Sequence, residues 1–285
     1  MSDNTKQKVR EFYDEIGWHE EDSGLYQNAR YEDLRPVSRE YIHKCHMRVK
    51  RYLAPSGDIL LDAGSGPVQW PEYLTYSEDY KYRLCADISI TALKEARNRL
   101  GDKGLYVVAD IANLPFKPEV FDGVVSMHAI HHLPVAEHKK AYSELYRVMK
   151  NARTGVVVNG WDSPKITQVM AVIVRPLRIL KSLLTRGQLP GFIKKKGARS
   201  VALHTGTHIR KTDAEWLRNE LADVAPMKIY VWRSLSTRIL RILVHQWLGG
   251  YFFLKLVYWL EEKYPKFFGE NGQYPLIVIS KSDGK

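Results

Sequence analysis

The chain has 285 residues, of which 45% are hydrophobic, so it can bury the core of one large domain. Its 43 lysines and arginines outnumber 32 aspartates and glutamates, and the net charge of +11 bears on anionic partners rather than on fold. Cys45 and Cys85 are isolated, which argues against a disulfide framework or a metal site. No window reaches the ~20 uncharged apolar residues of a membrane-spanning helix, and the polar first twenty residues lack the apolar run of a secretory signal. We therefore expect a cytoplasmic protein that binds no metal.

Two helices are expected at the start of the chain, and a parallel sheet after them. The helices cover residues 5–17 and 37–53, with a polar and aromatic loop between them. The next hundred residues alternate between short apolar runs and helical patterns, which is typical of βαβ units. The predicted strands here are residues 58–61, 82–86, 105–109, 123–126 and 155–159, and the predicted helices are residues 90–100 and 136–150.

The same alternation resumes in the last third of the chain. Thr212 is the expected N-cap of a helix over residues 213–222, and residues 227–232 and 275–280 are predicted to be two further strands. The sequence thus predicts an α/β fold, with a Rossmann-like, seven-stranded and mostly parallel sheet that carries helices on both faces.

Two helical insertions, after strands five and six, interrupt this pattern. The first is basic and amphipathic, with no acidic residue between Ser163 and Thr212, and the second is aromatic and broken at Gly249-Gly250. Both should emerge at the carboxyl ends of their strands. We therefore divide the chain into leading helices (1–57), a sheet core (58–160), a basic insertion (161–211), a helix and strand (212–233), an aromatic insertion (234–270) and a final strand and tail (271–285).

The first predicted strand ends in an acid, Asp62, and a glycine turn, Gly64-Ser65-Gly66. Glycines let the backbone turn sharply and approach a ligand closely, and open α/β sheets bind ligands above the ends of their strands. Asp87 ends the second strand, where a carboxylate can accept hydrogen bonds from both hydroxyls of a ribose. Asp110 ends the third strand in the same way.

The ligand predicted from this turn is a cationic nucleoside. Gln69 takes the place of the last glycine in the dinucleotide motif Gly-x-Gly-x-x-Gly, and a pyrophosphate has no use for Asp62. The sulfonium and amino groups of S-adenosylmethionine would be favoured by that acid. A nicotinamide oxidoreductase remains an alternative on the glycine turn alone.

Four ordered motifs resemble those of the class I S-adenosylmethionine-dependent methyltransferases, particularly the small-molecule branch that includes quinone-biosynthesis methyltransferases. They are Leu61–Gly66, Ala86–Ser89, Ala109–Phe116 and Phe121–Leu133, and the resemblance spans about a third of the chain. It implies S-adenosylmethionine as the cofactor, S-adenosylhomocysteine as the product and residues 58–160 as the cofactor-binding core. Val68 departs from the family pattern, which often has a third glycine at this place.

The resemblance also implies a role for single residues. The first acid and the glycine turn would surround the methionine part of the cofactor, the second acid would hold the ribose, and the residues after the second and third strands would contact the adenine. The end of the fourth strand would meet cofactor and acceptor. The implied cofactor-binding residues are Asp62, Gly64, Ser65, Gly66, Asp87, Ile88, Asp110, Ile111, Ser126 and His128.

In similar enzymes the leading helix and loop close the site. Residues 1–57 are therefore a candidate lid, with Tyr13, Trp18, Tyr26 and Tyr31 over the cofactor; the alternative is that these aromatic side chains belong to the core.

Histidines are the candidate catalytic residues. Methyl transfer is an in-line displacement that mainly requires alignment and the exclusion of water, and a general base helps when the acceptor is a hydroxyl. His128 or His131 would be that base, with His132 as a third imidazole nearby. The alternative is that these histidines only pack within their turn.

The insertions leave the acceptor and partners open. They are expected to form a cap that binds a small or lipid-like acceptor, and their mixture of basic and aromatic residues also suits an anionic membrane surface. Nucleic acid is disfavoured, because no RNA-binding module occurs. The predicted function is transfer of a methyl group to a small or amphipathic acceptor, with oxygen as the first choice of accepting atom. The protein itself is expected to be cytoplasmic and to lie peripherally on the inner face of a membrane. The alternatives are a noncatalytic regulatory or membrane-docking protein that binds S-adenosylmethionine and, less favoured, an RNA methyltransferase.

Overall fold

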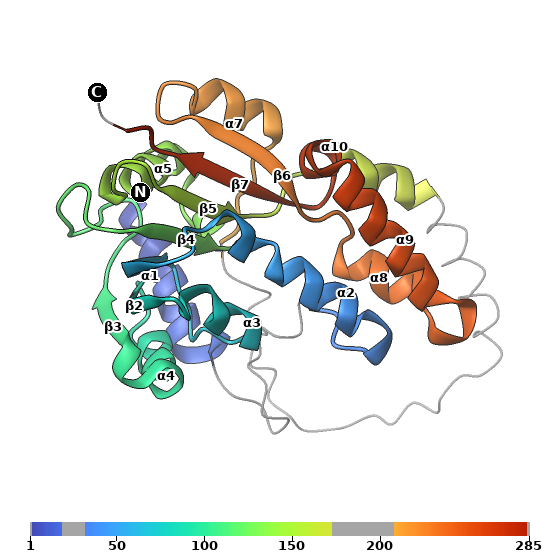
Figure 1. The fold of residues 1–285 in the computed structure, drawn as a ribbon, viewed down its shortest axis with the longest axis horizontal. Coiled ribbons are helices and arrows are strands. Elements are labelled where there is room, and N and C mark those ends of the chain that lie inside the picture. The colour runs from blue at the N-terminus through green and yellow to red at the C-terminus, as the bar shows by residue number, and fades with distance from the viewer. Residues whose placement is uncertain (1, 19–31, 173–207, 284–285) are drawn as a thin grey trace.

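The computed structural model describes residues 2–18, 32–172 and 208–283 (Figure 1). Tyr26, Tyr31 and most of the predicted basic insertion lie outside these residues. Within them, residues 165–172 form the helical start of that insertion.

One sheet of seven strands organises the chain, in the order β3-β2-β1-β4-β5-β7-β6. Strands β1 to β5 run parallel, whereas β7 is antiparallel to both of its neighbours. The prediction of a mostly parallel, seven-stranded sheet is confirmed, and every predicted strand is present with its ends moved by a few residues. The strands are β1 (Gly57–Ala63), β2 (Tyr80–Asp87), β3 (Gly104–Val108), β4 (Gly123–Met127), β5 (Thr154–Val158), β6 (Met227–Arg233) and β7 (Tyr274–Ser280).

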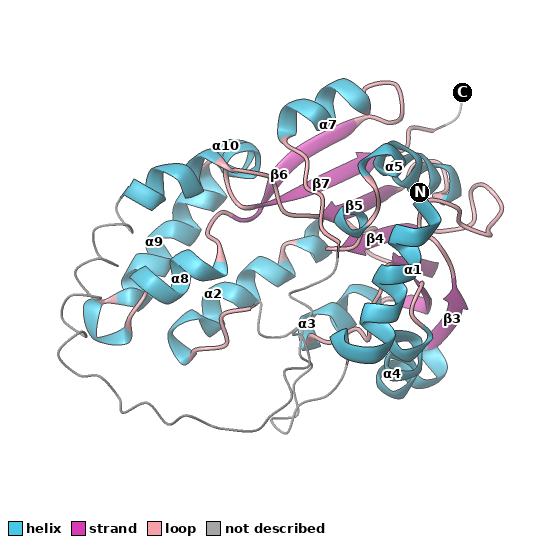
Figure 2. Ribbon diagram, turned by 180° about the vertical axis from the view of Figure 1, so that it is seen from behind, coloured by secondary structure: helices cyan, strands magenta, loops and turns pink. Residues whose placement is uncertain are grey.

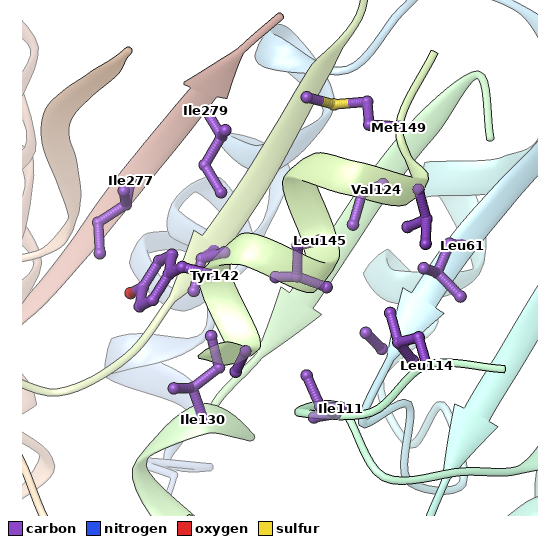
Figure 3. Packing of buried hydrophobic residues seen from close by; sticks show 14 of the residues in the cluster. Leu61, Ile111, Leu114, Val124, Ile130, Tyr142, Leu145, Met149, Ile277 and Ile279 are labelled. Carbon is purple, nitrogen blue, oxygen red and sulfur yellow. The ribbon is translucent and has the colours of Figure 1, made fainter. Parts of the chain in front are cut away.

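Helices α5 (Val135–Val148) and α7 (Ala214–Glu220) cover one face of the sheet. Every second side chain of a strand points to this face, as Leu61, Val124 and Val157 do, and these residues are buried against the two helices. Figure 3 shows part of this cluster, with the helix that carries Tyr142 and Leu145 lying over the strands.

The opposite face is covered by α3 (Pro71–Leu74) and α4 (Ile90–Leu100). Leu60, Val125 and Val156, which alternate with the residues of the first face, are buried here. Both faces of the central strands are therefore dry, which explains why these strands are apolar throughout their length.

The leading helices are α1 (Ser2–Phe12), continued by a π-helical turn over Tyr13–Gly17, and α2 (Pro36–Met47). The second predicted helix is thus shorter than expected, and a separate 3₁₀ turn follows it over Val49–Tyr52.

The N-cap of α7 is Asp213 and not the predicted Thr212. The Asp213 carboxylate accepts a hydrogen bond from the backbone N–H of Trp216 over 2.8 Å. The helix therefore begins one residue later than the threonine would place it, because the carboxylate satisfies an N–H that has no partner within the helix.

The aromatic insertion consists of three helices, α8 (Thr237–Leu243), α9 (Gly250–Lys263) and α10 (Pro265–Asn271). The predicted break is confirmed at Gly249, whose φ of 69° is in the left-handed region that favours glycine. Because β6 is parallel to β5, the insertion leaves the sheet at the same edge as the carboxyl ends of β1 to β5.

Helices α8 and α9 lie beside α2 (Figures 1 and 2). A buried carboxylate, Glu261, joins them: Tyr41 Oη donates to it over 2.7 Å, and Arg48 forms an ion pair with it at 2.9 Å. No helix among the described residues is long and apolar enough to cross a membrane.

Candidate active site

A cavity of about 330 Å³ opens at the carboxyl ends of β1, β2 and β4. This size falls within the range of roughly 300–1,000 Å³ that is common for ligand pockets. Its wall combines the turns after these strands with the end of α1 and its π-helical continuation. Segments far apart in the sequence therefore meet where the strand ends predicted a ligand site.

The glycine turn forms one side of this cavity. Gly64 and Gly66 have φ values of 73° and 53°, and a Cβ on Gly64 would overlap the side chain of Ala129. Val68, which replaces the family's third glycine, also has a positive φ, 52°, and its side chain is fully buried. The turn thus keeps a left-handed geometry that is strained for a β-branched residue.

Asp87 lies at the end of β2, inside the cavity wall and held by two backbone N–H groups. Its Oδ2 accepts from Gly66 N and its Oδ1 from Ser89 N, each over 2.8 Å. Burial raises the pKa of Asp87 to about 6. Each carboxylate oxygen keeps a further lone pair, so the aspartate is oriented to accept bonds from the two hydroxyls of a ribose.

Ile88 and Ile111 supply apolar walls beyond this acid, and Asp110 lies next to them. The Asp110 carboxylate is fixed by Asn113 Nδ2 at 2.7 Å and by Lys6 Nζ at 2.6 Å. An apolar slot with polar groups at its edge suits a purine base, and the lysine connects this edge to α1.

The end of the leading segment covers the glycine turn. Tyr13 and Trp18 line the cavity and stack on each other with ring centroids 5.1 Å apart. Tyr13 Oη forms a hydrogen bond of 2.8 Å with His132 Nε2, and Ser89 Oγ donates to Asp14 Oδ1 over 2.5 Å. This position is what a lid over the cofactor requires.

Trp18→Ala should weaken cofactor binding about tenfold, mainly through faster dissociation, because the indole covers Gly66 and its loss removes buried contact worth about 1–2 kcal/mol. Stopped-flow displacement of bound S-adenosylhomocysteine measures the rate. Trp247→Ala, which alters a tryptophan outside the cavity, is the matched control and should leave the rate unchanged. An equal effect of both changes would mean that Trp18 is no part of a lid.

Two implied cofactor residues, Asp62 and Ser126, do not line the cavity. Both are buried, and Arg83 forms an ion pair with Asp62 from the neighbouring strand. We expected the charge of Asp62 to face a cationic ligand, but in the structure Arg83 balances this charge. The other implied residues do line the cavity: Gly64, Ser65, Gly66, Asp87, Ile88, Asp110, Ile111 and His128.

The three histidines after β4 all reach the cavity but differ in their partners. His132 uses both ring nitrogens, one toward Tyr13 and the other toward the carbonyl of His208 at 2.9 Å. His128 has a φ of 57°, and its ring packs against Trp232 at 5.1 Å.

Burial lowers the pKa of His128 to about 3 and that of His131 well below its usual value. Both imidazoles are therefore neutral at physiological pH, and the same burial makes them weak bases in the unliganded protein. His132 is already engaged on both sides, which leaves His128 and His131 as candidate bases.

The end of the cavity away from Asp87 holds charged residues that the sequence did not identify. Arg233, at the end of β6, is fully buried in an ion pair with Glu32. Burial alone would raise the pKa of Glu32, but Arg233 and His46 lower it to about 2. Lys211 Nζ lies against Gly160 and has no hydrogen-bond partner among the described residues. The one feature of the sequence that could have pointed to these residues is the position of Arg233 at the end of a predicted strand.

The aromatic insertion does not line the cavity: none of residues 234–273, which lie between Arg233 and Tyr274 in the sequence, is part of its wall. The expected cap over the acceptor is therefore built differently: Ile209 and Lys211 come from the end of the basic insertion, while α8 and α9 pack on α2 instead. Among the described residues no group of histidine, cysteine and acidic side chains is arranged to hold a metal ion.

The sheet order and the cavity at its carboxyl edge define a Rossmann-like α/β protein. The cyclase SpnF has the same fold, with a TM-score of 0.54 at 18% identity over 98% of both chains. Phosphoethanolamine N-methyltransferase 1 of Haemonchus contortus was solved with phosphoethanolamine and S-adenosylhomocysteine. Its structure matches with a TM-score of 0.57 at 11% identity, over 100% of this chain and 51% of that one.

Sequence comparison identifies the domain. Residues 61–156 match the family model described as a methyltransferase domain. The tRNA (carboxymethyluridine(34)-5-O)-methyltransferase of Arabidopsis thaliana is 40% identical over 98 residues, which are 34% of this chain and 22% of that protein. A probable tRNA methyltransferase 9B of Mus musculus is 30% identical over 122 residues, 42% of this chain and 26% of that protein. The chain thus spans about a quarter of the length of these relatives.

Residues 61–156 are thus similar to a methyltransferase domain, for which S-adenosylmethionine is the cofactor. The residues of the cavity fit this cofactor: the glycine turn leaves no room for a Cβ, Asp87 is oriented toward a ribose, and two isoleucines form an apolar slot.

Proposed function

We propose that the protein transfers the methyl group of S-adenosylmethionine to a small or amphipathic acceptor, with oxygen as the accepting atom. The observation that carries this proposal is the cavity itself, which the cofactor residues around Asp87 line together with two neutral histidines. A cytoplasmic location, with peripheral attachment to the inner face of a membrane, is part of the same proposal.

The bound cofactor supplies an electrophilic methyl carbon on sulfur. Asp87 holds the ribose, and Ile88 and Ile111 hold the base, so the cofactor is fixed in one orientation. Tyr13 and Trp18 exclude water from above. His128 would accept the proton of the acceptor hydroxyl, and the bound cofactor would supply the methyl group.

The composition of the far end supports an amphipathic acceptor. Trp70, Tyr73 and Tyr274 provide apolar surface, and Lys211 provides a cation without a described partner. An acceptor with an apolar body and a polar or anionic group would satisfy both parts of this wall.

His128→Asn should lower the single-turnover rate of methyl transfer about 100-fold, because a positioned general base contributes about 10²–10⁴-fold. Asparagine is chosen since it tolerates the left-handed backbone at this position. Cofactor affinity, measured by calorimetry, should stay within about twofold.

His131→Ala is the companion variant, since this imidazole is the other candidate base. A large loss in His131→Ala alone would move the role of base to that residue. Near-normal rates in both variants would remove the base from the mechanism and leave alignment as the source of catalysis.

The relatives that methylate tRNA favour a second candidate acceptor, RNA, although they match only part of this chain. Radiolabelled S-adenosylmethionine should be incubated with the protein and, separately, with lipid extract, polar metabolites and total RNA. We expect label in an organic-soluble or small polar product. Label confined to RNA would replace our proposal with RNA methylation, and tight cofactor binding without transfer to any fraction would favour a noncatalytic role.

A further inference from the structure

The outer face of α9 exposes large apolar side chains, although the helix packs well on its inner side. Leu254 and Glu261 point inward and are buried. Phe252, Leu256 and Trp259 follow one another at spacings of four and three residues, so they share the opposite face of the helix. The side chain of Phe252 is 78% exposed.

This face continues into the neighbouring turns. Trp247 is 80% exposed in the 3₁₀ turn before α9, and Phe267 is 58% exposed on α10. Several large apolar side chains exposed on neighbouring elements indicate an interaction site in a folded protein. We call it the outer aromatic surface, made of Trp247, Leu248, Phe252, Leu256, Trp259 and Phe267.

Lysines accompany these side chains. Lys255 and Lys263 fall on the same face of α9 as Phe252, and Lys266 lies on α10. Lys263 Nζ lies 4.9 Å from the ring centroid of Trp259. Of the two acids on α9, Glu261 is buried, and Glu262 forms ion pairs with Arg48 at 2.9 Å and Arg51 at 2.7 Å.

The outer aromatic surface is therefore apolar and cationic at once. Single-stranded nucleic acid is bound where aromatic rings line a basic groove along its backbone, whereas these side chains project from a convex helix. A binding site for one small molecule would need a concave wall, whereas these side chains project from a helix. Interfacial helices that carry lysine beside tryptophan, phenylalanine and leucine bind the boundary between lipid headgroups and acyl chains.

We propose that the outer aromatic surface docks the protein on an anionic phospholipid bilayer. The rings and leucines enter the headgroup boundary, while the lysine ammonium groups remain at the level of the lipid phosphates. None of these residues lines the cavity. This inference rests on the peripheral attachment in the proposed function and names the surface that would provide it. Because that surface lies outside the cavity, loss of docking can be distinguished from loss of cofactor binding or methyl transfer.

Sedimentation of the full chain with vesicles tests this inference. We expect binding to phosphatidylcholine vesicles that contain phosphatidylserine, little binding to pure phosphatidylcholine, and weaker binding at high salt. Phe252→Ala/Trp259→Ala should reduce the partition coefficient about tenfold or more, since two large side chains leave the interface. Lys255→Gln/Lys263→Gln should lower binding and flatten its salt dependence.

Leu105→Ala/Val108→Ala is the matched control, because it removes two exposed apolar side chains from β3, at the other edge of the sheet. This variant should bind vesicles as the unaltered chain does. All variants should keep their unfolding temperature and their affinity for S-adenosylhomocysteine, which separates lost docking from lost folding or a failed cofactor site.

Three results would overturn the proposal. The first is vesicle binding that is absent, or that is unaffected by Phe252→Ala/Trp259→Ala. The second is a concentration-dependent dimer in light scattering that this variant abolishes, which would assign the surface to a second copy of the chain. The third is RNA retention that depends on the same residues.

Discussion

Asp87→Asn should bind S-adenosylmethionine about 100-fold more weakly than the unaltered protein, equivalent to about 3 kcal/mol. An ionised carboxylate can accept bonds from both ribose hydroxyls while it also accepts from Gly66 N and Ser89 N. An amide has only one accepting oxygen and cannot serve both pairs. Isothermal titration calorimetry measures the loss.

The pH dependence of binding gives a second readout for Asp87. The pKa of about 6 in the free protein means that the carboxyl is largely protonated below this pH. Ribose hydroxyls donate to the ionised form, so affinity should fall as pH drops through 6, by about tenfold per unit at the limit. Asp87→Asn should show no such dependence.

Asp102→Asn changes an exposed aspartate and serves as the control, with unaltered affinity expected. If Asp87→Asn bound the cofactor normally, Asp87 would not be the ribose ligand that we infer. If the unliganded variant were unfolded, its loss of affinity would be purely structural.

Arg83→Ala should lower the free energy of unfolding by about 3–5 kcal/mol, the second large effect that we expect. Arg83 and Asp62 are 1% and 2% exposed, and the arginine also donates to the carbonyl of Tyr73. Truncation leaves the Asp62 carboxylate buried without its counter-charge. Denaturation by urea measures the change.

A double variant separates charge from packing at this pair. Asp62→Ala/Arg83→Met removes both charges and should recover a substantial part of the lost stability. Arg97→Ala, on the exposed side of α4, should change stability by less than about 0.5 kcal/mol. If the double variant recovered nothing, the cost would come from cavities and not from an unpaired charge.

The sheet could be predicted because its strands are apolar over their whole length and end in turn signals. Each predicted strand exists, and the glycine break before α9 has its positive φ. Helix ends were less accurate, since Thr212 and Asp213 are both good caps and only the position of the Trp216 N–H decides between them. The order of β6 and β7 depends on pairing between distant strands, which no local pattern encodes.

Part of the candidate site could also be predicted from sequence. Residues such as Gly64, Asp87 and Ile111 lie at or shortly after the ends of strands, so their place at the carboxyl edge comes from the sheet. Asp62 ends β1 as well, but its partner Arg83 is on another strand, and the sequence carries no sign of that contact. Lys211 and Arg233 reach the cavity from the last third of the chain, through tertiary packing alone.

The pairing of β6 with β7 joins Arg233 to Tyr274 across the two strands, at the point where the chain departs into α8 and returns from α10. The guanidinium lies 4.7 Å from the centroid of the tyrosine ring, and both side chains line the cavity. The chain thus leaves the sheet for the three helices, and returns from them, at two neighbouring residues that also line the cavity. A displacement of α8 to α10 relative to the sheet would therefore reach the cavity wall through Arg233 and Tyr274.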